Sequence, residues 1–231
     1  MGAFDADLHS LRARVSEMGG LAEELLSDAL QALHRRDAAL AERVVEGDRE
    51  LDMREVALEE MAVRTLALRQ PLAQDLRETI AALKIASTLE RIGDLSKNIA
   101  RRVPTLPRLP NDEIEDGILR LGEMARGQLA DVLDAYGMSD TRAAETVWRR
   151  DIDIDVLHND LLRRVISVMS QNNALVGHGA QLLFMTKNLE RIGDHTTFIA
   201  EMTYYVVIGR PLGDDRPKGD PLFPLPDSGE T

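Results

Sequence analysis

The block Leu-Glu-Arg-Ile-Gly-Asp occurs twice in the chain, at Leu89–Asp94 and again at Leu189–Asp194. Each copy stands late in a long helical pattern and is followed by Ile-Ala, at Ile99–Ala100 and at Ile199–Ala200. A block that recurs in the same surroundings is typical of a duplicated structural unit. The chain is therefore predicted to be two copies of one unit.

Each unit also carries an acidic pair with four-residue spacing upstream of its copy of the block. These pairs and the acids of the block give each unit four carboxylates in the same order: Asp48, Asp52, Glu90 and Asp94 in the first unit, and Asp151, Asp155, Glu190 and Asp194 in the second. A single acidic pair carries little weight in a chain with 40 Asp and Glu residues, since on an exposed helix face it only repels slightly. Whether the four acids of a unit form a site therefore depends on where the fold places them.

The composition favours a helical protein. Aromatic residues are only 3% of the 231 residues, and Leu, Ala, Val and Met supply most apolar side chains, which is typical of a helical core. The formal net charge of −12 argues against unassisted binding to nucleic acid or to an anionic lipid surface. A metal ion or a basic surface on another protein is the complementary partner.

The lack of cysteine excludes disulfides, thiolate metal sites and cysteine nucleophiles, and it is compatible with a reducing compartment. Neither a signal peptide nor a membrane span is predicted. Met1–Ser10 contains two aspartates and no apolar stretch, and no segment approaches the ~20 apolar residues that cross a bilayer.

Apolar periodicity and chain breakers predict an all-α fold of two tandem antiparallel three-helix bundles related by internal duplication. The first expected helix carries an apolar seam from Leu8 to Ala29, and the second is capped by Asp37 and ends near Gln70. The third runs from Pro71 to about Arg102, and the fourth from Ile114 to near Gly137. The fifth is capped by Ser139 or Asp140 and ends near Ser170, and the sixth runs from about Leu175 to Ile208.

The predicted organisation has four parts. They are a first bundle over residues 1–102, a Pro-rich linker over residues 103–113, a second bundle over residues 114–210 and a disordered tail over residues 211–231. Three prolines in Val103–Pro110 exclude a helix in the linker, and Pro, Gly and Asp are enriched in the tail.

The register of each predicted hairpin brings its four carboxylates level. Residues that face each other on two antiparallel helices have residue numbers that add up to a constant sum. In the first unit this condition pairs Asp48 with Asp94 and Asp52 with Glu90, and in the second it pairs Asp151 with Asp194 and Asp155 with Glu190. The sum is centred on Pro71 in the first unit and between Asn172 and Asn173 in the second, which are the strongest turn signals available. In the third and fifth helices the acids also continue the apolar seam rather than the solvent face.

Four carboxylates on a helix-packing seam repel one another and lose hydration, which costs several kcal/mol. A bound cation offsets this cost, and oxygen ligands suit iron, manganese, magnesium, calcium or zinc. Gly93 and Gly193, inside the repeated block, are expected to admit a close backbone or an ion. The alternative is a purely ionic network, in which Arg91, Arg191 or other basic residues neutralise the acids.

With these residues in view, the chain resembles the PhoU family of phosphate-signalling regulators from about Leu8 to Arg210. The most specific matches are Gln70-Pro71 with Asp75–Arg77, Leu83–Ala86, both Leu-Glu-Arg-Ile-Gly-Asp blocks, and Leu182–Phe184. The resemblance implies two three-helix bundles whose Glu/Asp-x-x-x-Asp motifs hold multinuclear iron or zinc clusters at the surface, with the eight carboxylates named above as metal ligands. One departure separates the halves: Lys97-Asn98 follows the first block, where the family commonly has Asn, and Thr197-Phe198 follows the second.

The resemblance further implies a function. PhoU-like proteins are negative regulators of the phosphate regulon, non-enzymatic adaptors that connect the ATPase of the ABC phosphate transporter with a membrane sensor histidine kinase. For this chain it implies a cytoplasmic adaptor that reaches the inner face of the membrane through its partners. A homodimer formed through the bundle faces is also expected. If the carboxylates flank a groove instead of a sealed core, the metal would be loosely held and could be absent after purification.

Two other function classes stay open. A ferritin-like di-metal enzyme or metal store uses Glu-x-x-His pairs inside a four-helix bundle, whereas the first unit has no histidine near its acids. A metal-free helical adaptor would keep its partners after Asp94 and Asp194 are both replaced by Asn. His158 and His195 could complete a site in the second unit, although a hydrogen-bonding or surface role is the simpler interpretation. Trp148 is expected in the core beneath the acids of its helix.

Overall fold

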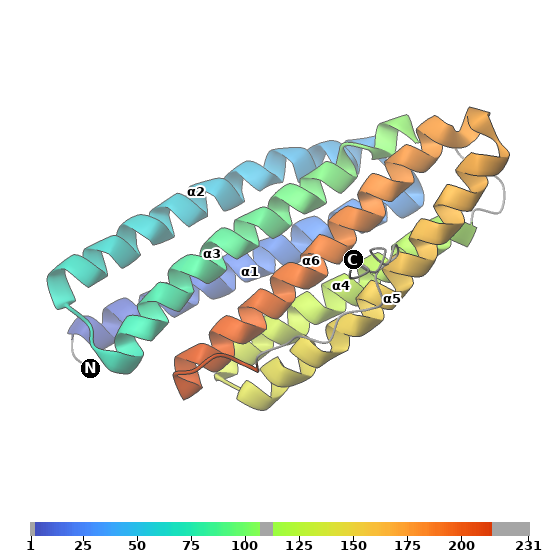
Figure 1. Cartoon of the computed structure of the whole chain (residues 1–231). Helices are drawn as coiled ribbons and strands as arrows, with labels where there is room; N and C mark the ends of the chain where they lie inside the picture. Colours follow the sequence, from blue (N-terminus) through green and yellow to red (C-terminus); the bar gives the residue numbers. More distant parts are fainter. Residues whose placement is uncertain (1–2, 107–112, 214–231) are drawn as a thin grey trace, which may run out of the picture.

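A computed structural model describes residues 3–106 and 113–213 of the chain (Figure 1). This part folds into long α-helices joined by short turns and contains no strand. Its elements are α1 (Ala3–Arg35), α2 (Ala38–Arg69), α3 (Ala73–Ala100), the 3-10 helix η1 (Val103–Thr105), α4 (Glu113–Met138), α5 (Thr141–Gln171), the 3-10 helix η2 (Asn173–Leu175) and α6 (Val176–Ile208). The predicted all-α fold of two tandem antiparallel three-helix bundles is confirmed.

Aspartate caps fix where two of the long helices begin. Asp37 accepts a hydrogen bond from the backbone N–H of Leu40 (2.9 Å) at the start of α2. Asp140 accepts from two backbone N–H groups at the start of α5, whereas the alternative cap, Ser139, adopts a left-handed conformation (φ 54°) in the preceding turn. Each cap satisfies N–H groups without a partner inside the helix and contributes about 1 kcal/mol.

Two predicted boundaries differ from the structure. α3 begins at Ala73 rather than at Pro71, because Gln70 and Ala73 adopt left-handed conformations (φ 48° and 49°) on either side of the turn. The exclusion of any helix from the linker is wrong, since Val103–Thr105 forms η1. Its proline stands at the first turn of this helix, where the missing N–H would have no intrahelical partner anyway.

The predicted linker and tail lie only partly within the described residues, because residues 107–112 and 214–231 fall outside them. The first residues after α6 pack on the second bundle: Leu212 is buried, and a Cβ at Gly213 would lie 3.5 Å from the indole of Trp148. Trp148 is buried in the core as predicted, and its Nε1 donates to Glu201 (3.1 Å).

One hydrophobic core runs through both bundles. The predicted α1 seam from Leu8 to Ala29 is buried along its whole length, and each fully buried leucine contributes about 2 kcal/mol to folding. None of the helices in the described ranges combines the length and the apolar character needed to cross a membrane.

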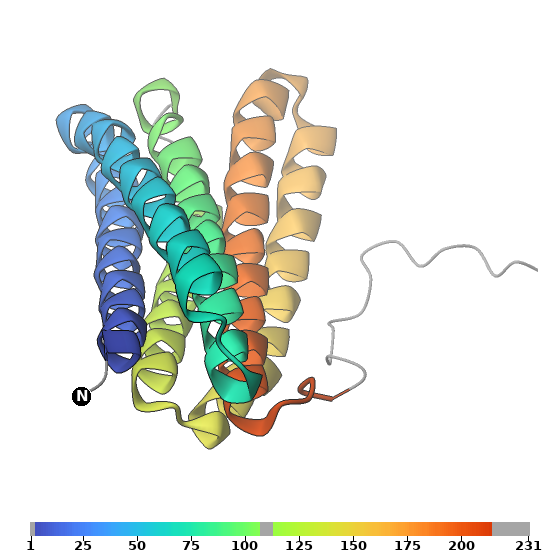
Figure 2. The ribbon, with the colours of Figure 1, turned by 90° about the vertical axis from the view of Figure 1, so that its left-hand side faces the viewer.

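The bundles meet mainly through α3 and α6, which lie side by side and antiparallel at the centre of the molecule (Figures 1 and 2). At one end of this contact the guanidinium of Arg102 lies over the ring of Phe184, 5.0 Å from its centre. At the other end Arg77 donates to the backbone carbonyl of Val206 (3.3 Å). These two contacts fix a register in which the two copies of the repeated block face each other at mid-length. We call this line of contact between α3 and α6 the α3–α6 seam.

Candidate functional site

The acids of the first unit come together between α2 and α3. The pKa of Glu90 is raised to about 7, first because its carboxyl group is partly buried and then because the negative charges of Asp94, Glu55, Asp52 and Asp48 act on it. The structure therefore brings together all four carboxylates that the hairpin register predicted, and α2 adds Glu55. These five residues are the first acid cluster.

Lys97, one turn after the repeated block, neutralises part of the first acid cluster. Its Nζ donates to Oδ2 of Asp48 on α2 and to Oδ1 of Asp94 on α3. The Asp48 side chain is 3% exposed and that of Asp94 47%, so the pair with Asp48 is the buried one. Burial works to lower the pKa of Lys97, but the hydrogen bonds with both aspartates outweigh it and raise the pKa. An internal ammonium ion thus stands where a metal was expected.

Asp48 is only partly compensated by Lys97. Burial raises the pKa of Asp48; the hydrogen bond and charge of Lys97 pull it down, while Asp52 and Asp94 push it up, and the net shift is upward. The other carboxylate oxygen, Oδ1, is buried without a hydrogen-bond partner among the described residues. A buried acceptor left unpaired costs about 1–3 kcal/mol. The first acid cluster therefore retains an unmet demand for positive charge.

The second acid cluster lies between α5 and α6 and consists of Asp151, Asp155, His158, Glu190 and Asp194. Asp151 is 1% exposed and packs against Gly193, where a Cβ would lie 2.8 Å from its Oδ1. The negative charges of Glu190 and Asp155 both act on His158, which is buried. The predicted register thus also brings the acids of α5 beside the repeated block on α6.

His158 occupies the helix position that Glu55 occupies in the first unit, since each stands seven residues after the buried aspartate. Burial lowers the pKa of His158, and the charges of Glu190 and Asp155 offset this only in part. The imidazole makes a hydrogen bond with the backbone of Thr186, whereas its Nδ1 is buried without a partner among the described residues. Histidine binds metal in this form, as a neutral ring with one nitrogen held and the other available.

The neutral amide of Gln128 hydrogen-bonds to Asp151, whereas the charged Lys97 hydrogen-bonds to Asp48 in the first bundle. In the orientation that satisfies both ends of the Gln128 amide, its oxygen accepts from the Asp151 backbone N–H (3.2 Å) and its nitrogen donates to Asp151 Oδ1 (3.3 Å). The first bundle has Leu25 on the α1 side of Gly93 instead, 3.7 Å from the position of a Cβ there. The buried aspartate of the second cluster is therefore hydrogen-bonded without being neutralised by that group.

The position of Lys97 is taken by Thr197 in the second unit, and its hydroxyl donates to the backbone carbonyl of Asp194 (2.7 Å). A lysine on the other side of the block, Lys187, pairs with Glu190 (2.6 Å) and is 54% exposed. Its charge therefore lies at the rim of the second acid cluster, whereas that of Lys97 lies between the helices of the first.

The expected roles of two other basic groups are not those that the structure shows. Arg91 and Arg191 are exposed, whereas Lys97 pairs with Asp94 and Lys187 pairs with Glu190 of the repeated blocks. His195 lies apart from His158, at the α3–α6 seam. Burial lowers the pKa of His195, and the positive charges of Arg191 and Arg91 lower it further.

Gly93 and Gly193 admit side chains of the neighbouring helix rather than a close backbone. A Cβ at Gly93 would lie 2.5 Å from Leu51 and 3.1 Å from Oδ1 of Asp48. At Gly193 it would meet Oδ1 of Asp151 at 2.8 Å. The glycine of each block therefore makes room for the buried aspartate that faces it.

The side chains as they stand do not complete a metal site. Within the ranges that the structure describes, no group of three or more His, Cys, Asp or Glu residues is arranged to hold an ion. The donors nevertheless suit one, because the second acid cluster offers carboxylate oxygens and an imidazole nitrogen, a set that binds zinc or iron. The first acid cluster offers oxygens alone, with Lys97 already between them.

Glu55 and Gln128 belong to the clusters but were not predicted from the sequence. Glu55 follows Asp52 by three residues and so shares its helix face, although the four-residue spacing of the acidic pairs does not include it. Gln128 lies on the buried face of α4 between Ala125 and Val132. Its link to Asp151 depends on how α4 packs against α5, which the spacing of residues along the chain does not show.

Comparison with known proteins connects both clusters to one family. A family model described as the PhoU domain matches residues 15–103 and again residues 118–203. The two matches coincide with the two bundles, and each contains one complete acid cluster.

Relatives match over nearly the whole chain. The phosphate-specific transport system accessory protein PhoU homolog of Caulobacter vibrioides is 43% identical over 221 residues, which are 95% of this chain and 96% of the relative. The accessory protein PhoU of Escherichia coli is 36% identical over 209 residues, 90% of this chain and 87% of the relative. The crystal structure of PhoU from Pseudomonas aeruginosa matches with a TM-score of 0.86 at 33% identity, over 90% of this chain and all of that chain (100%).

Proposed function

The chain belongs to the PhoU family, and from this premise we propose that it regulates phosphate uptake as an accessory to a phosphate transport system. Relatives that match over most of its length carry that description in their names. A structural neighbour from Streptococcus pneumoniae, with a TM-score of 0.84 at 30% identity, is named a phosphate transport system regulatory protein. The observation that carries the proposal is the PhoU domain match over both bundles.

We further propose a negative regulator without enzymatic activity, an adaptor between the ATPase of the ABC phosphate transporter and a sensor histidine kinase. One face of α2 supports a protein-binding role, because Met53, Val56 and Val63 are spaced to lie on it and are 61%, 55% and 54% exposed. Apolar side chains gathered on a helix face of a protein with this much charge suit docking to another protein.

The adaptor proposal is tested by retention of the two partners. The full chain, immobilised, is expected to retain the transporter ATPase and the sensor kinase, with more of each at high phosphate. Val56→Glu combined with Val63→Glu should reduce retention at least about tenfold if the α2 face is used, since charges at the centre of an interface are costly. Val156→Glu on α5, which replaces an equally exposed valine (57%), is the matched control. Failure of the wild type to retain either partner at any phosphate concentration would reject the adaptor.

We also propose that the acid clusters bind a transition-metal ion such as iron or zinc. In the second acid cluster Asp155, Glu190 and Asp194 would hold it, with Nδ1 of His158 as a nitrogen ligand and Asp151 beside them. In the first acid cluster the ligands would be Asp48, Asp52, Glu90 and Asp94, and binding there requires Lys97 to move away. The bound metal would supply positive charge that draws α5 to α6, or α2 to α3, and so couple metal content to the shape of each hairpin.

Elemental analysis of protein purified without chelator tests the metal proposal. At least about one equivalent of iron or zinc is expected per chain, bound mainly at the second acid cluster. Less than about 0.2 equivalents of any transition metal, together with no uptake on titration, would reject it. That result would leave the regulatory proposal standing as a metal-free adaptor.

A further inference from the structure

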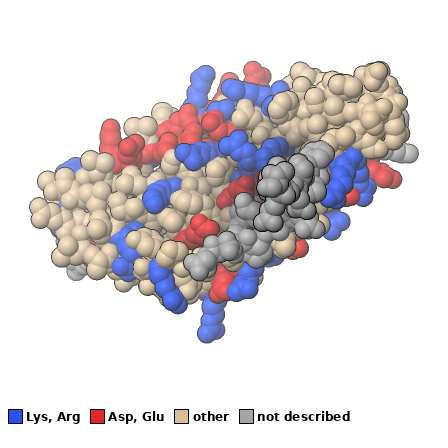
Figure 3. All heavy atoms as spheres, in the orientation of Figure 1, with Lys and Arg blue, Asp and Glu red and all other residues tan. Residues whose placement is uncertain are grey.

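The α3–α6 seam carries two arginines whose charge the acid clusters do not use. Arg91 on α3 and Arg191 on α6 are the corresponding residues of the two repeated blocks, and both are exposed. Figure 3 shows Lys and Arg side chains gathered across the middle of this face, with acidic side chains beside them. On a chain with a net charge of −12, a concentration of positive charge is unexpected and points to an anionic ligand.

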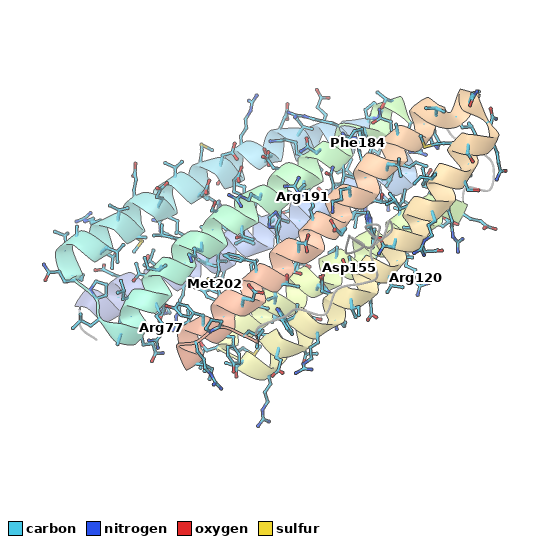
Figure 4. The ribbon with its side chains drawn as sticks, in the orientation of Figure 1. Arg77, Arg120, Asp155, Phe184, Arg191 and Met202 are labelled. Atoms are coloured by element: carbon cyan, nitrogen blue, oxygen red, sulfur yellow. The ribbon has the colours of Figure 1, made fainter. Side chains whose placement is uncertain are left out.

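The antiparallel register brings the two arginines to one place. Arg102 contacts Phe184 at one end of the seam, and Arg77 contacts Val206 at the other. Midway between these contacts Arg91 lies opposite the turn of α6 that follows Arg191. Figure 4 shows Arg191 over the contact of the two helices, with Phe184 toward one end and Met202 and Arg77 toward the other.

His195 lies between the two arginines. It is one helical turn after Arg191 on α6, and the register places it opposite Arg91 on α3. The charges of both arginines act on its ring, which agrees with this placement. Its Nε2 is buried without a hydrogen-bond partner among the described residues, and buried polar nitrogens of this kind are ordinarily satisfied by further protein groups, ordered water or a bound group.

Two carboxylates of the repeated blocks already have lysine partners. Asp94 is paired with Lys97 on the α2 side of α3, and Glu190 is paired with Lys187 on α6. A lysine thus pairs with one acid of each block, while the two arginines lie at the seam.

We propose that the centre of the α3–α6 seam is a binding site for a small tetrahedral oxyanion such as phosphate or sulfate, held by Arg91 and Arg191 with His195 beneath it. A guanidinium presents N–H donors in a planar fork that matches two oxygens of such an anion. Two forks from corresponding positions of a duplicated unit address opposite edges of one tetrahedron. The site exists only when both bundles are in contact, so an oxyanion bound there would hold them together. This inference does not depend on the regulatory role or on metal binding.

Titration of the full chain with sodium phosphate at fixed ionic strength, followed by NMR of the arginine Nε–Hε and histidine ring signals, tests the site. Saturable binding is expected with a Kd of about 1 mM, weak because the net charge of the chain opposes anions. Arg91→Gln combined with Arg191→Gln should weaken it at least about tenfold. Arg120→Gln combined with Arg142→Gln makes the same charge change on α4 and α5, away from the seam, and should alter it less than about twofold.

Sulfate and acetate distinguish the chemistry of the ligand. Sulfate should compete with phosphate, whereas acetate at equal concentration should not, because a carboxylate fills only one fork. No saturation of the wild type up to about 20 mM phosphate, equal losses in the seam and control variants, or equal binding of acetate would each overturn the proposal. If the seam variant fails to fold, the wild type still decides, since His195 signals that do not shift on phosphate addition would overturn the site.

Discussion

The two acid clusters stand at the same place in two copies of one unit, yet their charge is compensated in different ways. In the first, the buried Asp48 is paired with Lys97 on the facing helix. In the second, the buried Asp151 is held by the neutral amide of Gln128, and Thr197 replaces the lysine. Duplication has preserved the backbone contact at the glycine of each block while the source of positive charge has changed.

This difference indicates that the acid clusters of the two bundles have different roles. A lysine between two carboxylates supplies a permanent cation and competes with any metal for the same oxygens. The second acid cluster has Thr197 at the position of Lys97, and its buried imidazole nitrogen offers a metal a ligand beside carboxylate oxygens. We therefore predict that the first acid cluster acts mainly to hold α2 against α3, and that the second binds metal better.

Removal of Lys97 should have the largest effect on this comparison. Lys97→Met is expected to lower the free energy of unfolding by about 3 kcal/mol, because it leaves Asp48 buried without its cation. Thr197→Val at the corresponding position removes the hydroxyl hydrogen bond to the backbone carbonyl of Asp194 and should cost about 1 kcal/mol. Urea unfolding in the presence of chelator measures both. Equal losses at the two positions would show that the clusters are compensated alike.

Filling the glycine contact should have the next largest effect. Gly93→Ala forces the buried Leu51 to shift and is expected to cost about 2 kcal/mol, even after the gain of about 1 kcal/mol in helix propensity. Gly193→Ala meets the carboxylate of Asp151 instead and should cost a similar amount while also weakening metal uptake at the second acid cluster. Thermal unfolding measures the loss of stability in both variants, and metal titration shows whether Gly193→Ala also takes up less metal.

The control for these substitutions is Gly127→Ala, since a Cβ there has nothing within 4 Å. It should be neutral or stabilise the protein slightly. A loss at Gly127 as large as those at Gly93 and Gly193 would mean that helix backbone effects, rather than the aspartate contacts, set the cost.

Neutralising Glu90 should produce a smaller change, and its size depends on pH. The pKa of Glu90 in the folded chain is raised from 4.5 to about 7, mainly by burial, so the folded state binds a proton more tightly than the unfolded state does. Its contribution is favourable at low pH and is lost as pH rises through about 7. Glu90→Gln should therefore stabilise the metal-free protein by about 1 kcal/mol above that pH, a value discounted for solvent exposure.

Glu190→Gln is the counterpart of this change in the second bundle. It removes the pair with the exposed Lys187, so it should cost between about 0 and 1 kcal/mol. The free energy of unfolding of Glu90→Gln and Glu190→Gln, measured from pH 5 to pH 9 in the presence of chelator, tests this comparison. Stabilisation of equal size in both variants would contradict the difference between the two clusters.

The fold was largely predictable from the sequence because its signals are local and repeated. The α1 seam, the Asp37 cap and the turn at Pro71 each act within a few residues, and the structure confirms them. The facing of Asp48 with the block on α3 was also predictable, because two antiparallel helices joined by a short turn have only one register that keeps both apolar seams buried.

The details of the site were not predictable, because they depend on side-chain reach across helices. Lys97 and Arg91 are both cations near the acids, and only the rotation of α3 against α2 determines that Lys97 reaches Asp48. Gln128 and Asp151 belong to helices whose relative rotation is set by the whole core. The short helix at Val103–Thr105 was missed because proline was treated as a breaker even at a helix start, where it is tolerated.

The central claim is that the second acid cluster, which offers the imidazole of His158, binds metal better than the first, where Lys97 lies between the carboxylates. Metal content of Asp94→Asn and Asp194→Asn, each purified without chelator beside the wild type, tests it most directly. We predict that Asp94→Asn keeps the metal of the wild type and that Asp194→Asn loses most of it. Loss of metal from Asp94→Asn with retention in Asp194→Asn, or equal loss from both, would contradict the claim.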